Sequence, residues 1–427
     1  MNKYIFLGLL LIVCVGCSNN ESSKEVPEIT GDWFGAIETP NTLLPIEVTF
    51  DKDERLTGTI NIPAQNIQDF NLSNLKYQDD ELSFDMNIPG QVIRFKSKEV
   101  DEELIEGEFH QQGATFPFYL ERSTEGESST EDTASEIVSV ETNHGKLSGE
   151  LLLPEKETDT VALIIPGSGP TDRNGNSAAG TNNSLKMLAE LLREESIASL
   201  RYDKRGAGLN QEAIINEEDL SFDDFIDDAV FWLEKLRADD RFERLIVIGH
   251  SQGSLVGMTA AQQVEVDALI SLAGAGRPLN QVLQEQLSAQ LDGELLAEAK
   301  QIIEQLQEGR PVDDVSQPLQ STFRKSVQPF LISWMDYDPT TEISQLRIPI
   351  LIINGTTDLQ VSVEDAEMLH AEALNSELKI IDGMNHVLKI APEERSENLK
   401  TYNQPTLPLA EELKESIKVF LGKLDHH

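Results

Sequence analysis

The spacing of apolar and polar residues changes once along this chain, near residue 136. From residue 31 to residue 122, apolar residues alternate with polar ones in short runs, and Gly, Pro, Asn or Asp interrupts the runs about every ten residues. A period of two places every second side chain on the same face of a strand. We therefore predict a small all-β domain over residues 31–122, an antiparallel barrel or sandwich.

From residue 136 onward, apolar strands alternate with amphipathic helices. A hairpin around Asn143-His144-Gly145 is predicted first, and strands and helices then follow in turn. The expected elements are strands 161–165, 197–202, 245–248, 268–272, 350–353 and 378–381, and helices 184–195, 221–238, 254–261, 363–374 and 408–424. This alternation predicts an α/β fold, in which a doubly wound, mostly parallel sheet carries helices on both faces.

Two segments depart from these patterns. Residues 123–135 carry almost no apolar side chain, which predicts a linker between the two domains. Residues 276–341 contain amphipathic helices without a strand, and they predict a helical cap at the carboxyl ends of the strands, where such sheets bind ligands. The all-β domain has no cluster of catalytic residue types, so we expect a stabilising or spacing role, with ligand binding as the alternative.

A candidate nucleophile follows the predicted strand 245–248. The segment Gly249-His250-Ser251-Gln252-Gly253 has the form G-x-S-x-G, and a predicted helix begins directly after it. A serine between a strand and a helix in this pattern lies on a tight turn that exposes its hydroxyl, and the glycines remove Cβ atoms that would collide there. The helix N-terminus also favours developing negative charge. Ser251 is therefore predicted as a catalytic nucleophile, and a structural Gly-Ser turn is the alternative.

A serine nucleophile needs a base and a carboxylate that orients the base. His386 lies on a loop after the last predicted strand, at the same edge of the sheet as Ser251, and we predict it as the base. The other histidines lie in the β domain, a hairpin turn, the serine turn itself, a helix and the chain end: His110, His144, His250, His370, His426 and His427. Asp358 is preferred to Asp382 as the acid because it preserves the order Ser…Asp…His.

A glycine-rich segment and the predicted cap supply candidates for the remaining parts of the site. Backbone N–H groups of Ser168 or Gly169, which follow strand 161–165, are expected to join that of Gln252 as an oxyanion hole. In the cap, several large apolar residues lie close together, and part of them must pack on the core. We expect Phe330, Trp334 and Met335 to form the wall of an acyl pocket above Ser251.

Five segments together resemble a known family. They are Pro-Gly-Ser-Gly-Pro-Thr-Asp-Arg-Asn-Gly (166–175), Arg-Tyr-Asp-Lys-Arg-Gly (201–206), Gly-His-Ser-Gln-Gly (249–253), Gly-Thr-Thr-Asp-Leu-Gln-Val (355–361) and Asn-His-Val-Leu-Lys (385–389). Residues 136–427 are thereby similar to a bacterial group of serine esterases in the α/β-hydrolase superfamily, related to serine aminopeptidases and acyl hydrolases. Asn210 stands where relatives often carry Ser, and Gln252 stands where many carry Glu or Met.

The resemblance implies hydrolysis of small carboxylic esters with short to medium acyl groups. The reaction would proceed through an acyl-enzyme on Ser251 and would need no metal or organic cofactor. A peptidase or an acyl-thioesterase with the same triad is the alternative within enzymes. An inactive hydrolase-like lipoprotein whose β domain binds a ligand is the alternative outside them.

Charge and the first residues bear on partners and location. Lys and Arg number 34 against 75 Asp and Glu, and the net charge of −41 argues against nucleic acid or anionic headgroups as partners. Residues 1–16 are typical of a signal peptide, and Val15-Gly16-Cys17-Ser18 resembles a bacterial lipobox. We expect an exported protein anchored to a membrane by a lipid on Cys17, on the periplasmic or cell-surface side, with residues 17–30 as a tether. The pattern does not determine an oligomeric state.

The cysteine content limits the chemistry of the mature chain. Cys14 and Cys17 are the two cysteines of the sequence, and both lie in the predicted export segment. After cleavage and lipidation, no pair of thiols would remain for an internal disulfide or for a thiolate metal site.

Overall fold

The computed structural model describes residues 29–424 apart from 39–42, 53–54, 63–66, 79–80, 89–90, 102, 112–113, 123–134, 178–179 and 289–290. The predicted signal peptide and the predicted lipidation site Cys17 lie outside the described residues, as do most of the predicted tether and linker. Within the described part, no helix is long and apolar enough to span a membrane.

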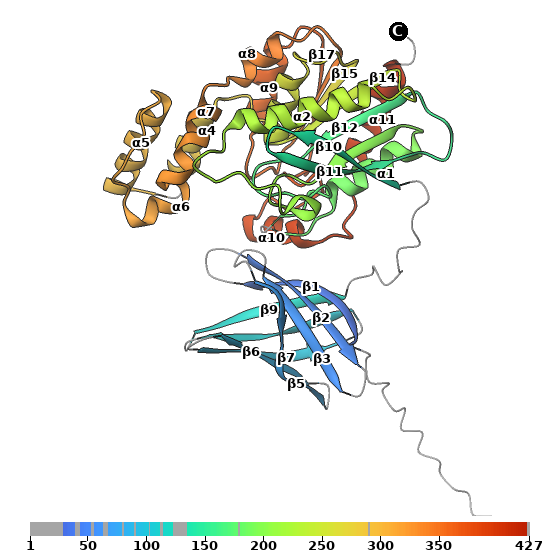
Figure 1. Ribbon diagram of the computed structural model, residues 1–427. Coiled ribbons are helices and arrows are strands. Elements are labelled where there is room, and N and C mark those ends of the chain that lie inside the picture. Colours follow the sequence, from blue (N-terminus) through green and yellow to red (C-terminus); the bar gives the residue numbers. More distant parts are fainter. Residues whose placement is uncertain are drawn as a thin grey trace, which may run out of the picture.

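The N-terminal part of the described chain is a strongly curled antiparallel sheet (Figure 1). Its nine described strands follow the order β4-β3-β2-β1-β9-β8-β7-β6-β5. Their bounds are β1 Gly31–Glu38, β2 Leu43–Lys52, β3 Leu56–Ile62, β4 Ile67–Asn71, β5 Ser73–Gln78, β6 Glu81–Ile88, β7 Gln91–Val100, β8 Leu104–Gln111 and β9 Ala114–Arg122. Alternate residues of these strands, among them Trp33, Phe84 and Phe95, are buried together inside the curl. The predicted antiparallel domain is confirmed, as one near-barrel sheet.

A second sheet organises the C-terminal part. Its described strands follow the order β10-β11-β13-β12-β14-β15-β16-β17; the strands from β13 onward in this order are parallel, and β11 is antiparallel to both of its neighbours, β10 and β13. Their bounds are β10 Ser135–Thr142, β11 Gly145–Leu152, β12 Thr160–Ile165, β13 Ala198–Tyr202, β14 Arg244–His250, β15 Ala268–Leu272, β16 Ile350–Gly355 and β17 Ser376–Ile381. The predicted mostly parallel sheet is therefore confirmed.

Helices cover both faces of this sheet (Figure 1). One face packs against α2 (Phe222–Arg237), α3 (Gln252–Ala260) and α9 (Val363–Glu372), and the other packs against α1 (Ser184–Glu194) and α11 (Glu411–Leu424). The inner strands are buried on both sides, because β12, β14, β15 and β16 supply alternate residues to the two apolar clusters. Ser221 and Asp224 form the reciprocal capping box at the start of α2.

The segment between β15 and β16 is helical, as predicted. It contains α4 (Leu279–Ser288), α5 (Gly293–Gln307), α6 (Gln320–Phe323), α7 (Gln328–Met335) and α8 (Pro339–Ser344). We call α4–α8 the helical insertion. Its first four helices extend to one side of the sheet in Figure 1 and share an apolar cluster of their own, which includes Ile303, Phe323 and Leu331. A short helix α10 (Arg395–Lys400) precedes α11.

Candidate active site

Ser251 lies at the turn between β14 and α3 with φ 53° and ψ −121°. Its N–H donates to the carbonyl of Leu272 at 2.9 Å, which ties the turn to the neighbouring strand β15. The flanking glycines make this path possible: a Cβ on Gly249 would lie 2.3 Å from the carbonyl oxygen of Gly253, and a Cβ on Gly253 would lie 2.3 Å from that of Ile165. The conformation is costly for a residue other than glycine, so the surrounding contacts must maintain it.

The structure brings Asp358 and His386 together. Asp358 follows β16, His386 follows β17, and Asp358 Oδ2 lies 2.8 Å from Nδ1 of the imidazole. The other oxygen of Asp358 accepts the backbone N–H groups of Gln360 (2.8 Å) and Val361 (3.0 Å), which fixes the orientation of the carboxylate. Asp382, the alternative acid, instead accepts the hydroxyl of Thr356 at an exposed position. Both members of the Asp358–His386 pair are buried.

His250 connects the serine turn to the histidine loop. Its Nε2 lies 2.8 Å from the carbonyl oxygen of His386, and the two imidazole rings are 5.0 Å apart between centroids. Burial, together with the nearby His386, lowers the pKa of His250 to about 4, so this ring is neutral at physiological pH. A neutral His250 donates to the backbone carbonyl of His386 and thereby ties the His386 loop to the residue that precedes Ser251. The sequence analysis had excluded His250 as the base and had assigned it no other role.

The glycine-rich segment after β12 runs beside Ser251. A Cβ on Gly167 would lie 3.3 Å from the Cβ of Ser251, a contact tight enough that the neighbouring residues would have to shift. Ser168 contributes to the same cavity as Ser251 and Gln252, whereas the described lining of that cavity does not include Gly169. Thr171 holds the turn, since its hydroxyl donates to the carbonyl of Ser168 at 2.9 Å.

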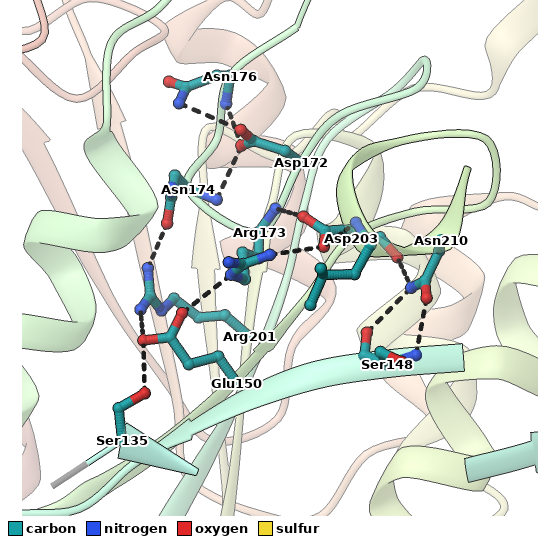
Figure 2. A network of polar contacts seen from close by, with 11 residues as sticks. Ser135, Ser148, Glu150, Asp172, Arg173, Asn174, Asn176, Arg201, Asp203 and Asn210 are labelled. Atoms are coloured by element: carbon teal, nitrogen blue, oxygen red, sulfur yellow. Dashed lines mark hydrogen bonds and ion pairs between the residues drawn. The ribbon is translucent and has the colours of Figure 1, made fainter. Parts of the chain in front are cut away.

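Ion pairs connect the segments that follow β12 and β13 to each other and to β11, as Figure 2 shows. Arg173 donates to Glu150 (2.9 Å) and to Asp203 (2.8 Å), and Arg201 donates to Glu150 at 3.0 Å. Burial alone would raise the pKa of Glu150, but Arg201 and Arg173 outweigh it and hold the pKa below its ordinary value. Asn210 bonds to both backbone groups of Ser148 on β11, at 2.7 and 2.9 Å. The network places the loops after β12 and β13 in one fixed relation to the sheet.

Lys204, between these anchoring residues, is buried beside the candidate oxyanion hole. Its Nζ donates to the carbonyl oxygen of Gly167 at 3.0 Å and to Oε1 of Gln252 at 2.7 Å. No pattern in the sequence distinguishes this lysine from the cations that anchor the loops on either side of it. Its position within Arg-Tyr-Asp-Lys-Arg-Gly, directly after a buried strand, is the feature of the sequence that places Lys204 near the site.

A cavity of about 250 Å³ opens onto Ser251. Helix α4 contributes Leu279, Val282, Leu283 and Gln286 to its wall, and α7 contributes Leu331 and Trp334. Trp334 therefore lies where the sequence predicted it, in the pocket wall. The indole also stacks on Phe222 of α2, with ring centroids 5.3 Å apart.

Two of the predicted pocket residues lie elsewhere. Phe330 packs edge-on against Phe225 of α2 at 5.6 Å between centroids, and Met335 is buried in the apolar cluster of the helical insertion. Neither belongs to the described lining of the cavity. The reason is the turn of α7: Leu331 and Trp334, three positions apart, share the face toward α4, and Phe330 points toward α2. The pocket predictions for Phe330 and Met335 are therefore corrected.

Parts of this chain are similar to known proteins. Residues 179–326 match the family described as serine aminopeptidase, S33. Esterase EstD of Thermotoga maritima is 25% identical over 258 residues, which cover 57% of this chain and 58% of EstD. The chain thus spans less than two thirds of the length of that relative.

Two solved structures are also similar. Est1E of Butyrivibrio proteoclasticus, with bound ferulic acid, is 18% identical, with a TM-score of 0.48 over 68% of this chain and 100% of that one. An esterase of Pyrococcus furiosus is 18% identical, with a TM-score of 0.45 over 68% of this chain and 91% of that one.

The segment that matches the family model covers the centre of the second sheet and part of the candidate site. The sheet has an antiparallel strand pair at one edge and parallel strands thereafter, a serine lies at the tight turn from β14 into α3, and an acid–histidine pair follows the last two strands. The matched segment contains that turn and much of the helical insertion. The chain is thus similar to the serine aminopeptidase, S33 family over residues 179–326 and to esterase EstD over 258 residues.

Proposed function

We propose that this protein hydrolyses carboxylic esters through an acyl-enzyme intermediate on Ser251. The observation that carries the proposal is the meeting of three segments. Ser251 has the strained conformation of an exposed nucleophile, the preceding His250 bonds to the backbone of His386, and His386 is paired with Asp358 at 2.8 Å. The nucleophile, the base and its orienting acid thus come from segments in direct contact.

The proposed reaction has two halves. Oγ of Ser251 attacks the ester carbonyl carbon while His386 takes the hydroxyl proton, and Asp358 stabilises the imidazolium that forms. The N–H groups of Gln252 and Ser168 stabilise the oxyanion. His386 then gives its proton to the departing alcohol, which leaves the acyl group on Ser251. Water then attacks this acyl-enzyme while His386 takes a proton from the water, and His386 returns that proton to Oγ of Ser251 as the carboxylic acid leaves.

The cavity lining favours esters over the substrates of an aminopeptidase. An enzyme that recognises a free α-amino group needs a carboxylate in its pocket to pair with that cation. Among the residues the structure describes, the cavity at Ser251 has no Asp or Glu in its lining, and Arg277 is the ionisable side chain there. A volume of about 250 Å³ lies just below the range of pockets for drug-sized ligands, which fits a short to medium acyl group.

We also propose that the helical insertion serves as a cap over this cavity. Polar contacts tie it to the α/β core on two sides. Arg277 forks onto both carboxylate oxygens of Asp365 at the start of α9 (2.9 and 2.7 Å). The hydroxyl of Ser333 on α7 accepts the N–H of Phe222 at the start of α2, at 2.7 Å. With α4 and α7 held over Ser251, a bound acyl group would be shielded from water.

Export and lipid anchoring remain a proposal that rests on the sequence around Cys17. Replacement of this cysteine by alanine should remove the acyl acceptor, so the variant should be unprocessed or soluble, whereas the wild type should fractionate with membranes and take up a lipid label. A wild-type protein that takes up no lipid and stays in the soluble fraction would refute the anchor.

A direct test combines a covalent probe with a substrate panel. Wild-type protein should be labelled by a fluorophosphonate at Ser251 and should cleave p-nitrophenyl esters faster than aminoacyl amides or acyl-thioesters. Ser251→Ala should abolish labelling and lower turnover by at least about 10³-fold, and adding His386→Ala should cost little more, because the residues act as a unit. Unchanged turnover in Ser251→Ala would refute the mechanism, and faster cleavage of aminoacyl amides would favour the peptidase alternative.

A further inference from the structure

Lys204 is a buried cation in direct contact with both sides of the candidate oxyanion hole. It follows β13, only 4% of its surface is exposed, and its N–H donates to the carbonyl of Thr171 at 3.0 Å. Its Nζ donates to the carbonyl oxygen of Gly167 and to Oε1 of Gln252, and it lies 3.9 Å from the centroid of the Phe225 ring. An ammonium group has three N–H donors, and each of them has a partner here.

These two hydrogen bonds determine where the oxyanion donors point. In a planar trans peptide the C=O and the next N–H point in opposite directions. Lys204 holds the carbonyl of Gly167, so the N–H of Ser168 in the same peptide is directed away from Lys204. Ser168 and Ser251 both line the cavity. The second bond holds the side chain of Gln252, the residue whose own N–H opens α3.

We infer that Lys204 is a positioning residue of the oxyanion hole, which holds the Gly167–Ser168 peptide and Gln252 in their productive orientation through its ammonium group. This inference rests on the proposed ester hydrolysis. Its positive charge, directly behind the donors, also favours the negative charge that develops on the substrate oxygen. Lys204 touches neither the nucleophile nor the base, so it acts through the two groups that it holds.

The electrostatic setting separates this role from that of an ordinary structural ion pair. The carboxylates nearest in sequence and space are already bound elsewhere: Asp203 to Arg173, and Asp228 of α2 to Arg205. On α3 the facing group is the neutral Gln252, and from α2 the Phe225 ring faces the ammonium. Burial therefore lowers the pKa of Lys204 to about 7, which the charge of Asp228 offsets only in part. A buried cation without a carboxylate partner of its own destabilises the fold, and such groups are concentrated at functional sites.

The test is Lys204→Met, which keeps the length of the side chain and removes its donors and charge. We expect kcat for a p-nitrophenyl ester to fall on the order of 10- to 100-fold, with KM within about threefold, since the loss affects the transition state. Active-site titration with a fluorophosphonate should still label about one serine per chain, which shows that the variant is folded. The matched control is Lys418→Met, which removes a lysine of α11 that pairs with Glu195 away from the cavity and should leave kcat unchanged.

The pH profile is the second readout. In the wild type, kcat/KM should decline on the alkaline side as Lys204 loses its proton, from a pH near 7, and this decline should be absent in Lys204→Met. An unchanged kcat per titrated serine in Lys204→Met, or the same alkaline decline in both proteins, would overturn the inference. Absence of both hydrolysis and labelling in the wild type would instead refute the proposed function, and this inference with it.

Discussion

At the scale of single residues, Ser251 shows how a fold maintains an unfavourable conformation. A positive φ at a residue with a side chain costs on the order of 1–3 kcal/mol, and here two glycines and a bond to β15 make the conformation possible. The strain keeps the hydroxyl clear of the sheet, toward the cavity. The folded state is thus less stable because of the conformation of Ser251, and the same conformation exposes the hydroxyl of this candidate nucleophile.

The need for space at Gly253 gives the first prediction. Gly253→Ala should lower the free energy of unfolding by about 1–3 kcal/mol or more and should lower activity, because the new methyl group would meet the backbone of Ile165. Urea denaturation measures the effect. The control is Gly422→Ala in α11, where a Cβ meets nothing within 4 Å and alanine should stabilise by about 0.5–1 kcal/mol. Equal effects of the two substitutions would show that the serine turn is not sterically constrained.

The buried ammonium of Lys204 gives a prediction about stability and pH. The pKa of Lys204 is lower in the folded state (about 7) than in the unfolded chain (10.5), so between these values the unfolded state binds more protons. The free energy of unfolding is therefore highest, as far as Lys204 is concerned, above pH 10.5, where the lysine is neutral in both states. It falls as pH falls toward 7, because the unfolded chain takes up a proton that the folded state binds less well. The wild type should gain stability relative to Lys204→Met as pH rises from 7 to 10, measured as the difference in unfolding free energy. A difference that is constant with pH would argue against the lowered pKa.

At the scale of elements, α7 divides its side chains between two tasks. Leu331 and Trp334 face the cavity, whereas Phe330 packs against α2 and Met335 lies in the insertion's own cluster. Trp334 shares both tasks because its ring also stacks on Phe222. The wall opposite comes from α4, so the width of the cavity depends on how these two helices are spaced, and we expect acyl selection to depend on it too.

A pair of alanine substitutions should separate these tasks. Leu283→Ala removes bulk from the α4 wall and should shift preference toward longer acyl groups, by about 0.8 kcal/mol or roughly fourfold in kcat/KM for each methylene newly buried. Phe330→Ala should instead lower stability and leave the order of preference among acyl groups unchanged. Rates with p-nitrophenyl acetate, butyrate and octanoate measure the shift. The assignment of the wall would be wrong if Phe330→Ala changed the acyl preference and Leu283→Ala did not.

Most of the sheet could be predicted from the sequence, because its buried strands are continuous apolar runs. The strand predicted at 161–165 is observed as Thr160–Ile165, and the helix predicted at 221–238 is Phe222–Arg237 with its capping box. The position of Asp358 could be reasoned from chain order. The cavity wall could not be predicted in the same way, because it depends on how α4 and α7 pack against each other. The role of Lys204 could not be predicted either, because a single lysine produces no periodic pattern in the sequence.

At the scale of the whole molecule, the candidate site lies entirely within the second sheet, its loops and the helical insertion. Every residue in the described lining of the cavity comes after residue 167, and the β domain ends at Arg122. The hydroxyl of Tyr119 on β9 accepts a hydrogen bond from Asn403 at 3.3 Å, between two segments that contribute nothing to the cavity.

The β domain should accordingly be dispensable for chemistry on small esters. A chain beginning at residue 135 should retain kcat for p-nitrophenyl acetate within about twofold, because the nucleophile, base, acid and pocket are all retained. Turnover per serine titrated with a fluorophosphonate is the measure, with the full chain as reference. A tenfold loss per titrated serine would assign the β domain a part in catalysis.

The route of the chain between β15 and β16 has a consequence for how such proteins diversify. Parallel neighbouring strands require a crossover, and α8, which packs near α3 and α9, already provides one through Ile343 and Leu346. Helices α4–α7 are thus an addition to a complete strand–helix–strand unit. These helices supply a large part of the described cavity lining, whereas Ser251, Asp358 and His386 lie on the core. Recombination between relatives within residues 279–335 would then transfer acyl preference as a module, which chimaeric proteins assayed on the same ester series would reveal.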